Sequence, residues 1–211
     1  MKYSILIIAA ILIATSSCKE KSHLSKNEQF IKDSTDLINV LEIIPNMVID
    51  VKYATTENLS GVAIYPNSNC YLKKSTAEKL KKAQAEIEKM GARLKIFDAY
   101  RPMSIQKKMW EMIPDERMIA NQSNGDKHSR GSSVDIALVS IDGKDIDMGS
   151  LYDARIPEAE RLCPSIDEKA RMFREILNQV MTNNGFIGSD EFWWHYDDID
   201  WEKNKSLDYP L

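Results

Sequence analysis

The sequence predicts an α+β fold: a single domain with a central antiparallel sheet flanked by helices. Three observations favour this class. The chain has 211 residues, of which 43% are hydrophobic and 28% charged, as is usual for a soluble globular domain. It contains segments with helical periodicity and also short runs rich in Val and Ile. These do not follow the strict βαβ alternation of a parallel sheet.

The charge of the chain argues against a nucleic-acid partner. The formal net charge is -4, and Lys and Arg do not gather in one stripe or segment. Proteins that bind phosphate backbones usually carry a basic face. We therefore expect a small-molecule partner rather than DNA or RNA.

The N-terminus has the pattern of an export signal. Lys2 precedes an apolar run over residues 5–14, and small polar residues lead into Cys18. Ten apolar residues are too few to span a bilayer but suit the central part of a secretory signal. The segment before Cys18 resembles the lipobox of bacterial lipoproteins, although Thr15 replaces the usual Leu.

This pattern predicts a signal peptide over 1–17, lipidation of Cys18, a polar tether over 18–36 and a folded domain over 37–211. The protein is then exported to the cell envelope and touches the membrane only through its lipid. An ordinary cleaved signal with a nearby cysteine is the alternative. The two other cysteines, Cys70 and Cys163, either pair or remain as buried free thiols.

The first half of the domain predicts a strand, a turn, a helix and a second strand. Residues 43–53 are rich in Val and Ile and predict an extended segment before a Pro- and Gly-containing turn. Ser75 and Glu78 form a capping-box pattern for a helix that ends near Gly91. Its predicted inward residues are Leu80, Ala83, Ile87 and Met90. Residues 94–97 predict a buried strand that runs directly into Asp98-Ala-Tyr-Arg-Pro102.

The second half predicts two helices and two strands. Apolar spacing predicts a helix after Pro102, and a loop over 121–125 separates it from a strand over 134–139. Ser165 with Glu168 is the predicted cap of a helix over 167–182. Residues 193–196 predict a final aromatic strand. The inward residues expected in the two helices are Ile105, Met109, Met112, Phe173, Ile176, Leu177 and Val180.

Two segments carry candidate metal ligands: His128-Ser-Arg-Gly-Ser-Ser-Val-Asp135 and Glu191-Phe-Trp-Trp-His195. The chain has three histidines, and the third, His23, lies in the polar N-terminal stretch. A catalytic zinc site usually has three protein ligands and an open position for water. His128, Asp135 and His195 supply three such ligands, and we expect the zinc site that they form to lie at one edge of the predicted sheet. Zinc lowers the pKa of bound water toward ~7 and polarises a carbonyl, so a peptide bond is the obvious target.

These segments, together with Asp98-Ala-Tyr-Arg-Pro102 and Met148-Gly-Ser-Leu-Tyr-Asp153, resemble the VanX-type D-alanyl-D-alanine dipeptidases of the zinc D,D-peptidase family. The resemblance extends from about Ile43 to Leu211. It implies one Zn²⁺ per chain, bound by the three ligands above, and hydrolysis of D-Ala-D-Ala or a related cell-wall dipeptide. It also implies that Arg101 stabilises the oxyanion, a role that suits a permanently charged, planar donor.

The resemblance further implies a substrate pocket. Asp153 matches the position that recognises the free ammonium of the dipeptide, with Tyr53 and Asp98 in the same pocket. Asp126 stands where the family usually has Ser, near the substrate backbone, and its charge is expected to change which peptide is accepted. The structural alternatives are turn capping for Asp153, core packing for Tyr53 and a salt bridge to Asp98 for Arg101.

The general base departs from the family pattern. The family has a glutamate three residues before the last histidine, and here that position is Phe192. Glu191 lies one residue further from His195. In an extended strand residues 191, 193 and 195 share a face, which favours Glu191 as the catalytic base.

Two other functions stay open. A zinc-containing, dipeptide-binding lipoprotein with weakened or lost catalysis is the alternative that Phe192 suggests. A carboxypeptidase that trims longer peptides is disfavoured by Asp153, because a longer peptide has no ammonium at that point.

Overall fold

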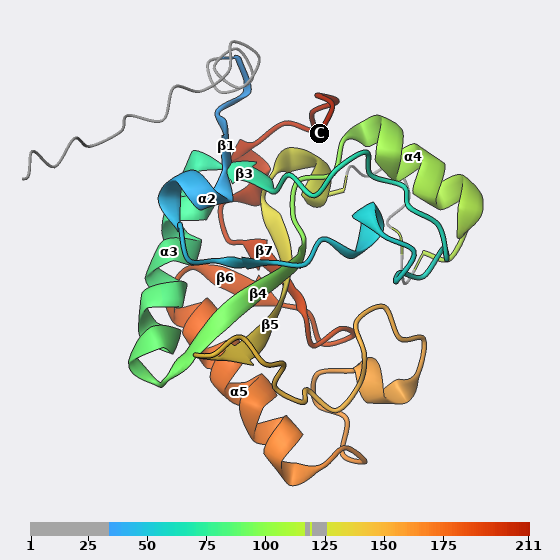
Figure 1. Ribbon diagram of the computed structural model, residues 1–211. Helices are drawn as coiled ribbons and strands as arrows, with labels where there is room; N and C mark the ends of the chain where they lie inside the picture. The colour runs from blue at the N-terminus through green and yellow to red at the C-terminus, as the bar shows by residue number, and fades with distance from the viewer. Residues whose placement is uncertain (1–33, 117–118, 120–125) are drawn as a thin grey trace, which may run out of the picture.

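The computed structural model describes residues 34–116, 119 and 126–211 (Figure 1). The predicted signal peptide, Cys18, His23, most of the predicted tether and the predicted loop over 121–125 lie outside the described residues. Within the described part of the chain, no helix has the length and apolar character needed to cross a bilayer.

A five-stranded sheet forms the centre of the domain, in the order β2-β4-β5-β7-β6. Its strands are β2 (Val48–Ile49), β4 (Ala92–Asp98), β5 (Ser133–Ser140), β7 (His195–Asp198) and β6 (Phe186–Gly188). The pair β2–β4 is parallel, and the other three pairs are antiparallel. The prediction of an α+β domain with a mainly antiparallel sheet is therefore confirmed.

A second, two-stranded sheet lies at one end of the domain. It pairs β1 (Leu37–Asn39) with β3 (Tyr71–Lys73) in antiparallel register. The extended segment predicted over 43–53 is only partly correct. Its first residue ends the short helix α2 (Val40–Ile43), only β2 is a strand, and Tyr53 lies in the 3₁₀ turn η1 (Lys52–Ala54). Tyr53 is 1% exposed, so burial of its ring overrides the local strand propensity of the segment.

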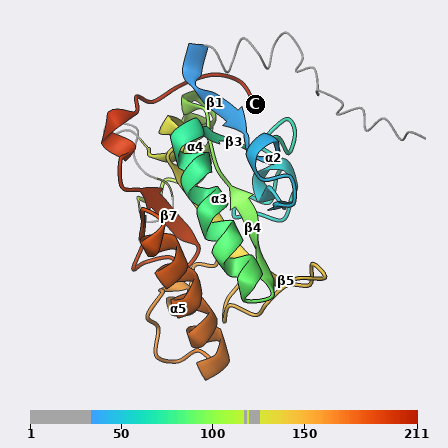
Figure 2. The same ribbon diagram turned by 90° about the vertical axis from the view of Figure 1, so that its left-hand side faces the viewer.

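Two long helices cover one face of the central sheet, α3 (Lys74–Lys89) and α5 (Glu168–Asn183). They lie side by side in Figure 2, in front of the strands. α4 (Met103–Met112) lies apart from them, near the C-terminus (Figure 1). The predicted stripes are largely confirmed, because Leu80, Ala83 and Ile87 of α3 and Leu177 and Val180 of α5 are buried.

Five residues expected in these stripes are exposed or only partly buried. Met90 is 61% exposed because it is the C-terminal cap of α3 rather than part of its face. Met112 is the last residue of α4 and is 41% exposed. Ile105 is partly buried against the main core, as are Phe173 and Ile176 of α5.

Both predicted helix caps are wrong. α3 begins at Lys74, directly after β3, and its N-terminal cap Lys73 makes no side-chain cap hydrogen bond. Ser75 therefore lies inside the first turn. At α5 the carboxylate of Asp167 accepts from the backbone N–H of Lys169 at 2.8 Å, so Asp167 is the cap. The Ser165 hydroxyl contacts the Cys163 sulfur instead.

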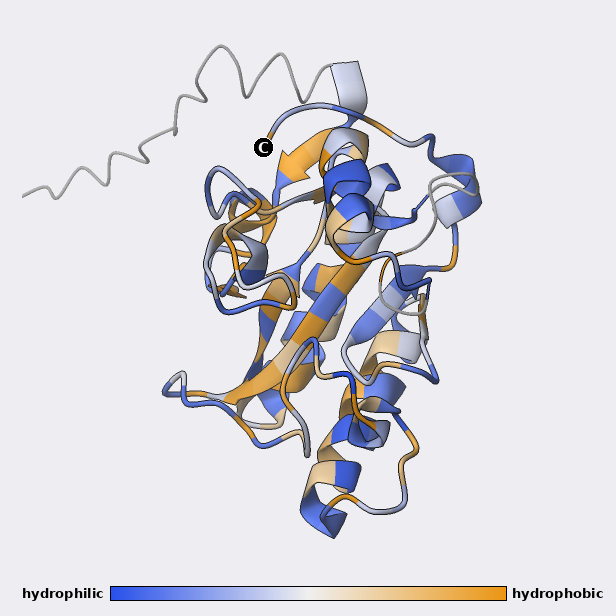
Figure 3. Ribbon diagram, turned by 90° about the vertical axis from the view of Figure 1, so that its right-hand side faces the viewer, coloured by the Kyte–Doolittle hydropathy of each residue, from blue (hydrophilic) through white to orange (hydrophobic). Residues whose placement is uncertain are grey.

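The main core lies between the sheet and the two long helices. β4 and β5 are buried along most of their length, as expected for strands covered on both faces. Figure 3 shows hydrophobic residues along these central strands. Cys70 lies in this core and Cys163 in a small separate cluster with Ile166 and Ala170, and both are free thiols.

Candidate metal centre and active site

The three predicted metal ligands converge at the ends of the two central strands β5 and β7. Asp135 and His195 are directly opposite each other in the β5–β7 ladder. His128 lies just before β5, in the 3₁₀ turn η3 (His128–Arg130). Asp135 Oδ1 is 2.8 Å from His195 Nδ1 and 3.5 Å from His128 Nε2. One candidate ligand atom from each residue lies within 4.8 Å of the others. The site therefore lies where β5 and β7 meet, and not along an edge strand of the sheet.

Gly131 allows the turn between His128 and Asp135 to pack tightly. Its φ of 65° is left-handed, which L side chains rarely adopt. A Cβ at this position would stand 2.7 Å from Leu37 Cδ2 and 3.1 Å from the backbone nitrogen of Lys73. The glycine of the motif therefore lets the first ligand turn rest on the β1–β3 sheet.

Each candidate ligand has an outward-facing atom that is held by a further group. His128 Nδ1 is 2.7 Å from the carbonyl oxygen of Ala99, and the Tyr152 hydroxyl donates to Asp135 Oδ2 at 2.9 Å. His195 Nε2 is 3.1 Å from Asp197 Oδ1. These contacts leave His128 Nε2, Asp135 Oδ1 and His195 Nδ1 facing one another. Ligand rings oriented in this way, with two imidazoles and one carboxylate, suit a three-ligand zinc site.

The charges of these groups depend on one another. Burial disfavours the imidazolium of His195, but hydrogen bonds and the charges of Asp135 and Asp197 outweigh it and raise the pKa to about 10. The pKa of His128 is also raised, because Asp135 outweighs burial. Despite its burial, Asp135 has a pKa well below the ordinary value because both histidines stabilise its anion. A metal that binds at these nitrogens therefore competes with protons.

The converged residues line a cavity of about 460 Å³. Eight of the ten predicted site residues line this cavity: Tyr53, Arg101, Asp126, His128, Asp135, Asp153, Glu191 and His195.

 The two predicted site residues outside this set are Asp98 and Cys18. Cys18 lies outside the described residues. The predictions made from separate motifs therefore meet in one place.

Asp98 was predicted in the substrate pocket, and that prediction is wrong. Asp98 is fully buried and does not line the cavity. It accepts hydrogen bonds from the Tyr65 hydroxyl at 2.7 Å and the Ala99 N–H at 2.9 Å, and it forms an ion pair with Arg101. Asp98 is opposite Asp135 in the β4–β5 ladder, and its carboxylate is fully buried. It holds Arg101 rather than substrate.

The Arg101 guanidinium is fixed from several sides and still reaches the cavity. Its Nε faces Asp98 and Tyr65, and its Nη1 donates to Gln106 at 2.7 Å and faces Asp126 at 3.4 Å. One Nη2 hydrogen points to Asp98, which leaves the other without a partner among the described residues. The predicted salt bridge and the predicted oxyanion role are therefore compatible, because the ion pair orients the donor that remains.

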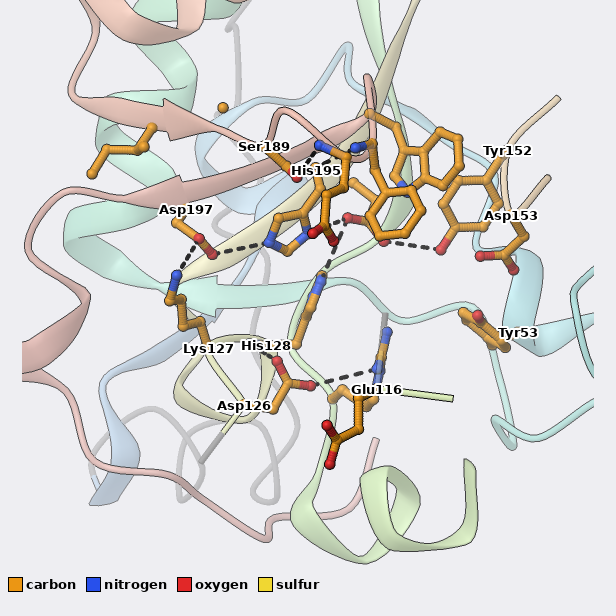
Figure 4. A pocket seen from close by; sticks show the side chains of 17 residues that line it. Tyr53, Glu116, Asp126, Lys127, His128, Tyr152, Asp153, Ser189, His195 and Asp197 are labelled. Atoms are coloured by element: carbon orange, nitrogen blue, oxygen red, sulfur yellow. Dashed lines mark hydrogen bonds and ion pairs between the residues drawn. The ribbon is translucent and has the colours of Figure 1, made fainter. Parts of the chain in front are cut away.

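Asp153 and Tyr53 form one end of the cavity. Figure 4 shows them on the same side of the two histidines. Asp153 has a left-handed φ of 59°, and its carboxylate accepts from the backbone N–H of Leu59 at 3.2 Å. Burial raises the pKa of Asp153 to about 7, against the opposing effect of a hydrogen bond from Tyr53. The hydrogen bonds to Asp153 do not fully offset the cost of burying its charge. A carboxylate of this kind in a cavity, on a strained backbone, is suited to a cationic ligand.

Asp126 lies at the opposite end, beside Lys127 (Figure 4). Its carboxylate accepts from the backbone N–H of His128 at 3.1 Å and faces Arg101. Asp126 thus has a structural task in the turn before the first ligand. Glu116, which the sequence analysis did not single out, also lines the cavity.

The segment before His195 is a turn, so the strand argument for Glu191 is wrong. β7 begins only at His195, and the His195 N–H donates to the carbonyl of Phe192 at 3.3 Å. The N–H groups of Glu191 and Phe192 both reach the Ser189 hydroxyl, at 3.1 and 3.3 Å. This turn nevertheless places Glu191 and Phe192 together in the cavity wall. Face alternation in a strand is not the reason that Glu191 reaches the site.

The two tryptophans of this turn differ. Trp193 is buried, donates from Nε1 to the Ser150 hydroxyl at 2.9 Å, and lies under the Arg174 guanidinium. Trp194 lines the cavity and stacks on Phe192 at 5.1 Å between ring centroids. Both pack as walls, and only Trp194 faces the site.

Sequence reasoning missed the residues that hold the ligands and Arg101. These residues are Tyr65, Gln106, Tyr152 and Asp197. Tyr152 stands next to the motif residue Asp153, and Asp197 stands two residues after His195 on the same strand. The i, i+2 spacing of His195 and Asp197 was a usable signal, because such residues share a strand face.

Comparisons with known proteins show the family of this chain. The profile of the D-Ala-D-Ala dipeptidase family matches residues 33–209. The chain belongs to this family. It is 34% identical to the D-alanyl-D-alanine dipeptidase of Escherichia coli strain K12, over 85% of this chain and 90% of that protein. It is 29% identical to the D-alanyl-D-alanine dipeptidase of Enterococcus faecalis, over 72% of this chain and 85% of that protein.

A solved structure of a mutant of the vancomycin resistance D,D-pentapeptidase VanY with Zn(II) also matches, with a TM-score of 0.42 and 13% sequence identity. That match covers 65% of this chain and 78% of the other. The family assignment rests on the sequence matches. As a member of the D-Ala-D-Ala dipeptidase family, the chain is a metallopeptidase.

Proposed function

We propose that this chain hydrolyses D-Ala-D-Ala or a related cell-wall dipeptide, with one zinc ion held by His128, Asp135 and His195. The observation that carries the proposal is that Glu191, Arg101 and Asp153 line the same cavity as these three residues. The names of the relatives support the substrate class. Nothing in the comparisons favours a binding protein without catalysis.

The substrate is oriented by its charged end. Asp153 accepts the free ammonium of the dipeptide, and the Tyr53 hydroxyl holds the Asp153 carboxylate in place. A longer peptide presents an amide rather than an ammonium at this point. With a dipeptide, the ammonium compensates the cost of burying the Asp153 carboxylate. With a longer peptide no cation does so, and binding is therefore weaker.

The chemical step uses Glu191 and Arg101. A bound zinc ion would lower the pKa of its water and polarise the scissile carbonyl. Glu191 takes a proton from that water and returns it to the leaving amine. Arg101 donates from Nη2 to the carbonyl oxygen as negative charge develops there. Asp98 and Gln106 keep this donor in place before the substrate arrives.

Replacement of Glu191 by Gln tests the base. We expect kcat for D-Ala-D-Ala to fall by roughly 100-fold or more, because Gln cannot move a proton, while zinc affinity is retained. Glu116→Gln is the matched control, since it neutralises another glutamate of the same cavity and should leave kcat within a few-fold. Full activity of Glu191→Gln would show that another group is the base. Absence of turnover by the zinc-loaded wild type on D,D-, L,D- and L,L-dipeptides would overturn the proposal.

Export and lipid attachment at Cys18 are a separate part of the proposal. They are supported by the apolar run over 5–14 and the small residues that precede Cys18. The full chain expressed in a bacterial host should fractionate with membranes, and Cys18→Ser should release it. Equal membrane association of both proteins would contradict lipidation at this cysteine.

A further inference from the structure

Asp197 lies beside the candidate ligand His195 on the same strand. The two residues are at positions i and i+2 of β7 and share one face of the sheet. Asp197 Oδ1 is 3.1 Å from His195 Nε2, on the side of the ring opposite Asp135 (Figure 4). His195 therefore lies between two carboxylates and meets each of them with a different ring nitrogen.

The Asp197 carboxylate is itself held firmly. Ser133 is opposite Asp197 in the β5–β7 ladder, and its buried hydroxyl donates to Asp197 Oδ1 at 2.5 Å. Lys127, one residue before His128, donates from Nζ to Asp197 Oδ2 at 2.5 Å. Asp197 is 7% exposed, so its position does not depend on solvent. Both of its oxygens are engaged by protein groups.

We infer that Asp197 is the positioning residue that determines which nitrogen of His195 binds the metal. Its carboxylate faces Nε2 and so leaves Nδ1 directed at Asp135 Oδ1, on the side where a metal would be held. The inference rests on the proposed metal site, and it deepens that proposal by assigning a role to a residue outside the ligand set. A carboxylate that accepts the second N–H of a ligand histidine also makes the ring a stronger ligand.

The network around Asp197 links the two halves of the site. Lys127 precedes the first histidine ligand, Ser133 lies between that ligand and Asp135, and Asp197 follows the last ligand. Lys127 also lies 5.1 Å from the ring centroid of Trp201, which limits its freedom. Lys127 and Ser133, which belong to the segment of the first two candidate ligands, thus hold Asp197 in place. Asp197 in turn holds His195, the third candidate ligand.

Zinc affinity of the folded, metal-depleted protein tests this role. Competition with a chromogenic chelator should show Asp197→Asn to bind zinc roughly 10- to 100-fold more weakly than wild type, because the neutral amide is a poorer acceptor. Asp142→Asn removes the same charge at a distant, exposed hairpin turn and should not change the affinity. Ser133→Ala removes one donor to Asp197 but leaves the acceptor of His195, and it should lose less affinity than Asp197→Asn.

A spectroscopic measurement on the wild type covers the case in which Asp197→Asn does not fold. In the zinc-loaded protein, imidazole ¹⁵N shifts should show Nδ1 of His195 as the coordinated atom and Nε2 as protonated. The Co²⁺-loaded Asp197→Asn protein should show shifted visible bands. Wild-type zinc affinity in Asp197→Asn, or coordination of zinc through Nε2, would overturn the role of Asp197. Equal zinc affinity of wild type and His195→Ala would instead refute the metal site itself.

Discussion

Asp153 shows how a single residue can be tuned for binding at the expense of stability. It adopts a left-handed backbone conformation and is held in a buried position, where its pKa is about 7. The folded chain therefore keeps the Asp153 proton between pH 3.8 and about 7, whereas the unfolded chain releases it. Ionisation of Asp153 thus lowers the free energy of unfolding as the pH rises through this range.

This residue predicts a pH dependence. The kcat/KM of the wild type for a dipeptide should fall as the pH drops below about 7, since protonated Asp153 no longer attracts the ammonium. Asp153→Asn should raise KM at least roughly tenfold and lose that limb of the profile, while its unfolding temperature above pH 7 should rise. Steady-state kinetics and thermal unfolding at several pH values provide the check. An unchanged acidic limb in Asp153→Asn would assign the pH dependence to another group.

The sequence predicted the residues that carry chemistry better than those that hold them. The convergence of His128, Asp135 and His195 could be predicted because few residue types bind zinc and the chain has few histidines. Tyr65 and Gln106 could not, because a tyrosine or glutamine in a mixed segment has no distinctive pattern until the fold brings it to Arg101. The role of Asp98 was wrongly predicted for the same reason, since its partner Tyr65 lies far from it in the sequence.

At the scale of elements, helix α5 supports the loop that carries Asp153, the residue proposed to bind the ammonium. Arg174 projects from α5, is 1% exposed, and donates to the backbone carbonyls of Glu158 and Glu160 at 2.7 and 2.8 Å. It also donates to the carbonyl of Met148. One side chain thus binds both ends of the segment that contains Tyr152 and Asp153. Burial lowers the pKa of Arg174 to about 10, so it stays charged at neutral pH.

Removal of this side chain should loosen the loop. Arg174→Met is expected to lower the free energy of unfolding by about 2–4 kcal/mol, because several buried carbonyls lose their donors. The KM for a dipeptide should rise, while zinc affinity, measured on the fraction that is folded, should change little. Arg171→Met on the same helix is the control, and it should cost less than about 1 kcal/mol because Arg171 is exposed. Equal effects of both substitutions would contradict a special role for Arg174.

The buried faces of the helices could be predicted, because hydrophobic periodicity determines them. The residues at which the helices begin could not, because a single polar side chain can determine a cap. The buried stripes of α3 and α5 follow from spacing alone. The caps do not, since Ser165 and Asp167 are both acceptable cap residues and the chain uses Asp167. The strand expected over 193–196 starts two residues later, because Trp193 is anchored by a backbone hydrogen bond to Ala159.

For the whole molecule, burial rather than cross-linking protects the two described thiols. Cys70 lies in the main core and Cys163 in a separate cluster, and burial raises the pKa of the Cys70 thiol far above its ordinary value.

The fold class could be predicted because sheet and helix patterns mix in the sequence. The parallel pairing of β2 with β4 could not, because a two-residue strand leaves too short a pattern.

The burial of both thiols predicts inert, reduced cysteines. In the native protein Cys70 and Cys163 should resist alkylation, and both should be alkylated after unfolding without reductant. Mass spectrometry of the labelled peptides gives the result, and the unfolding temperature should be the same with and without reductant. A disulfide-linked pair of peptides containing Cys70 and Cys163 would contradict the prediction.

The closed turn before His195 fixes where β7 begins. Its first residue is tied to its last, because the Ser189 N–H donates to the carbonyl of His195 at 3.0 Å, and the Trp193 N–H donates to the carbonyl of Ala159. β7 then pairs with β5 in a register that keeps His195 opposite Asp135. The position of His195 is therefore set by backbone hydrogen bonds rather than by the side chains of Glu191 and Phe192.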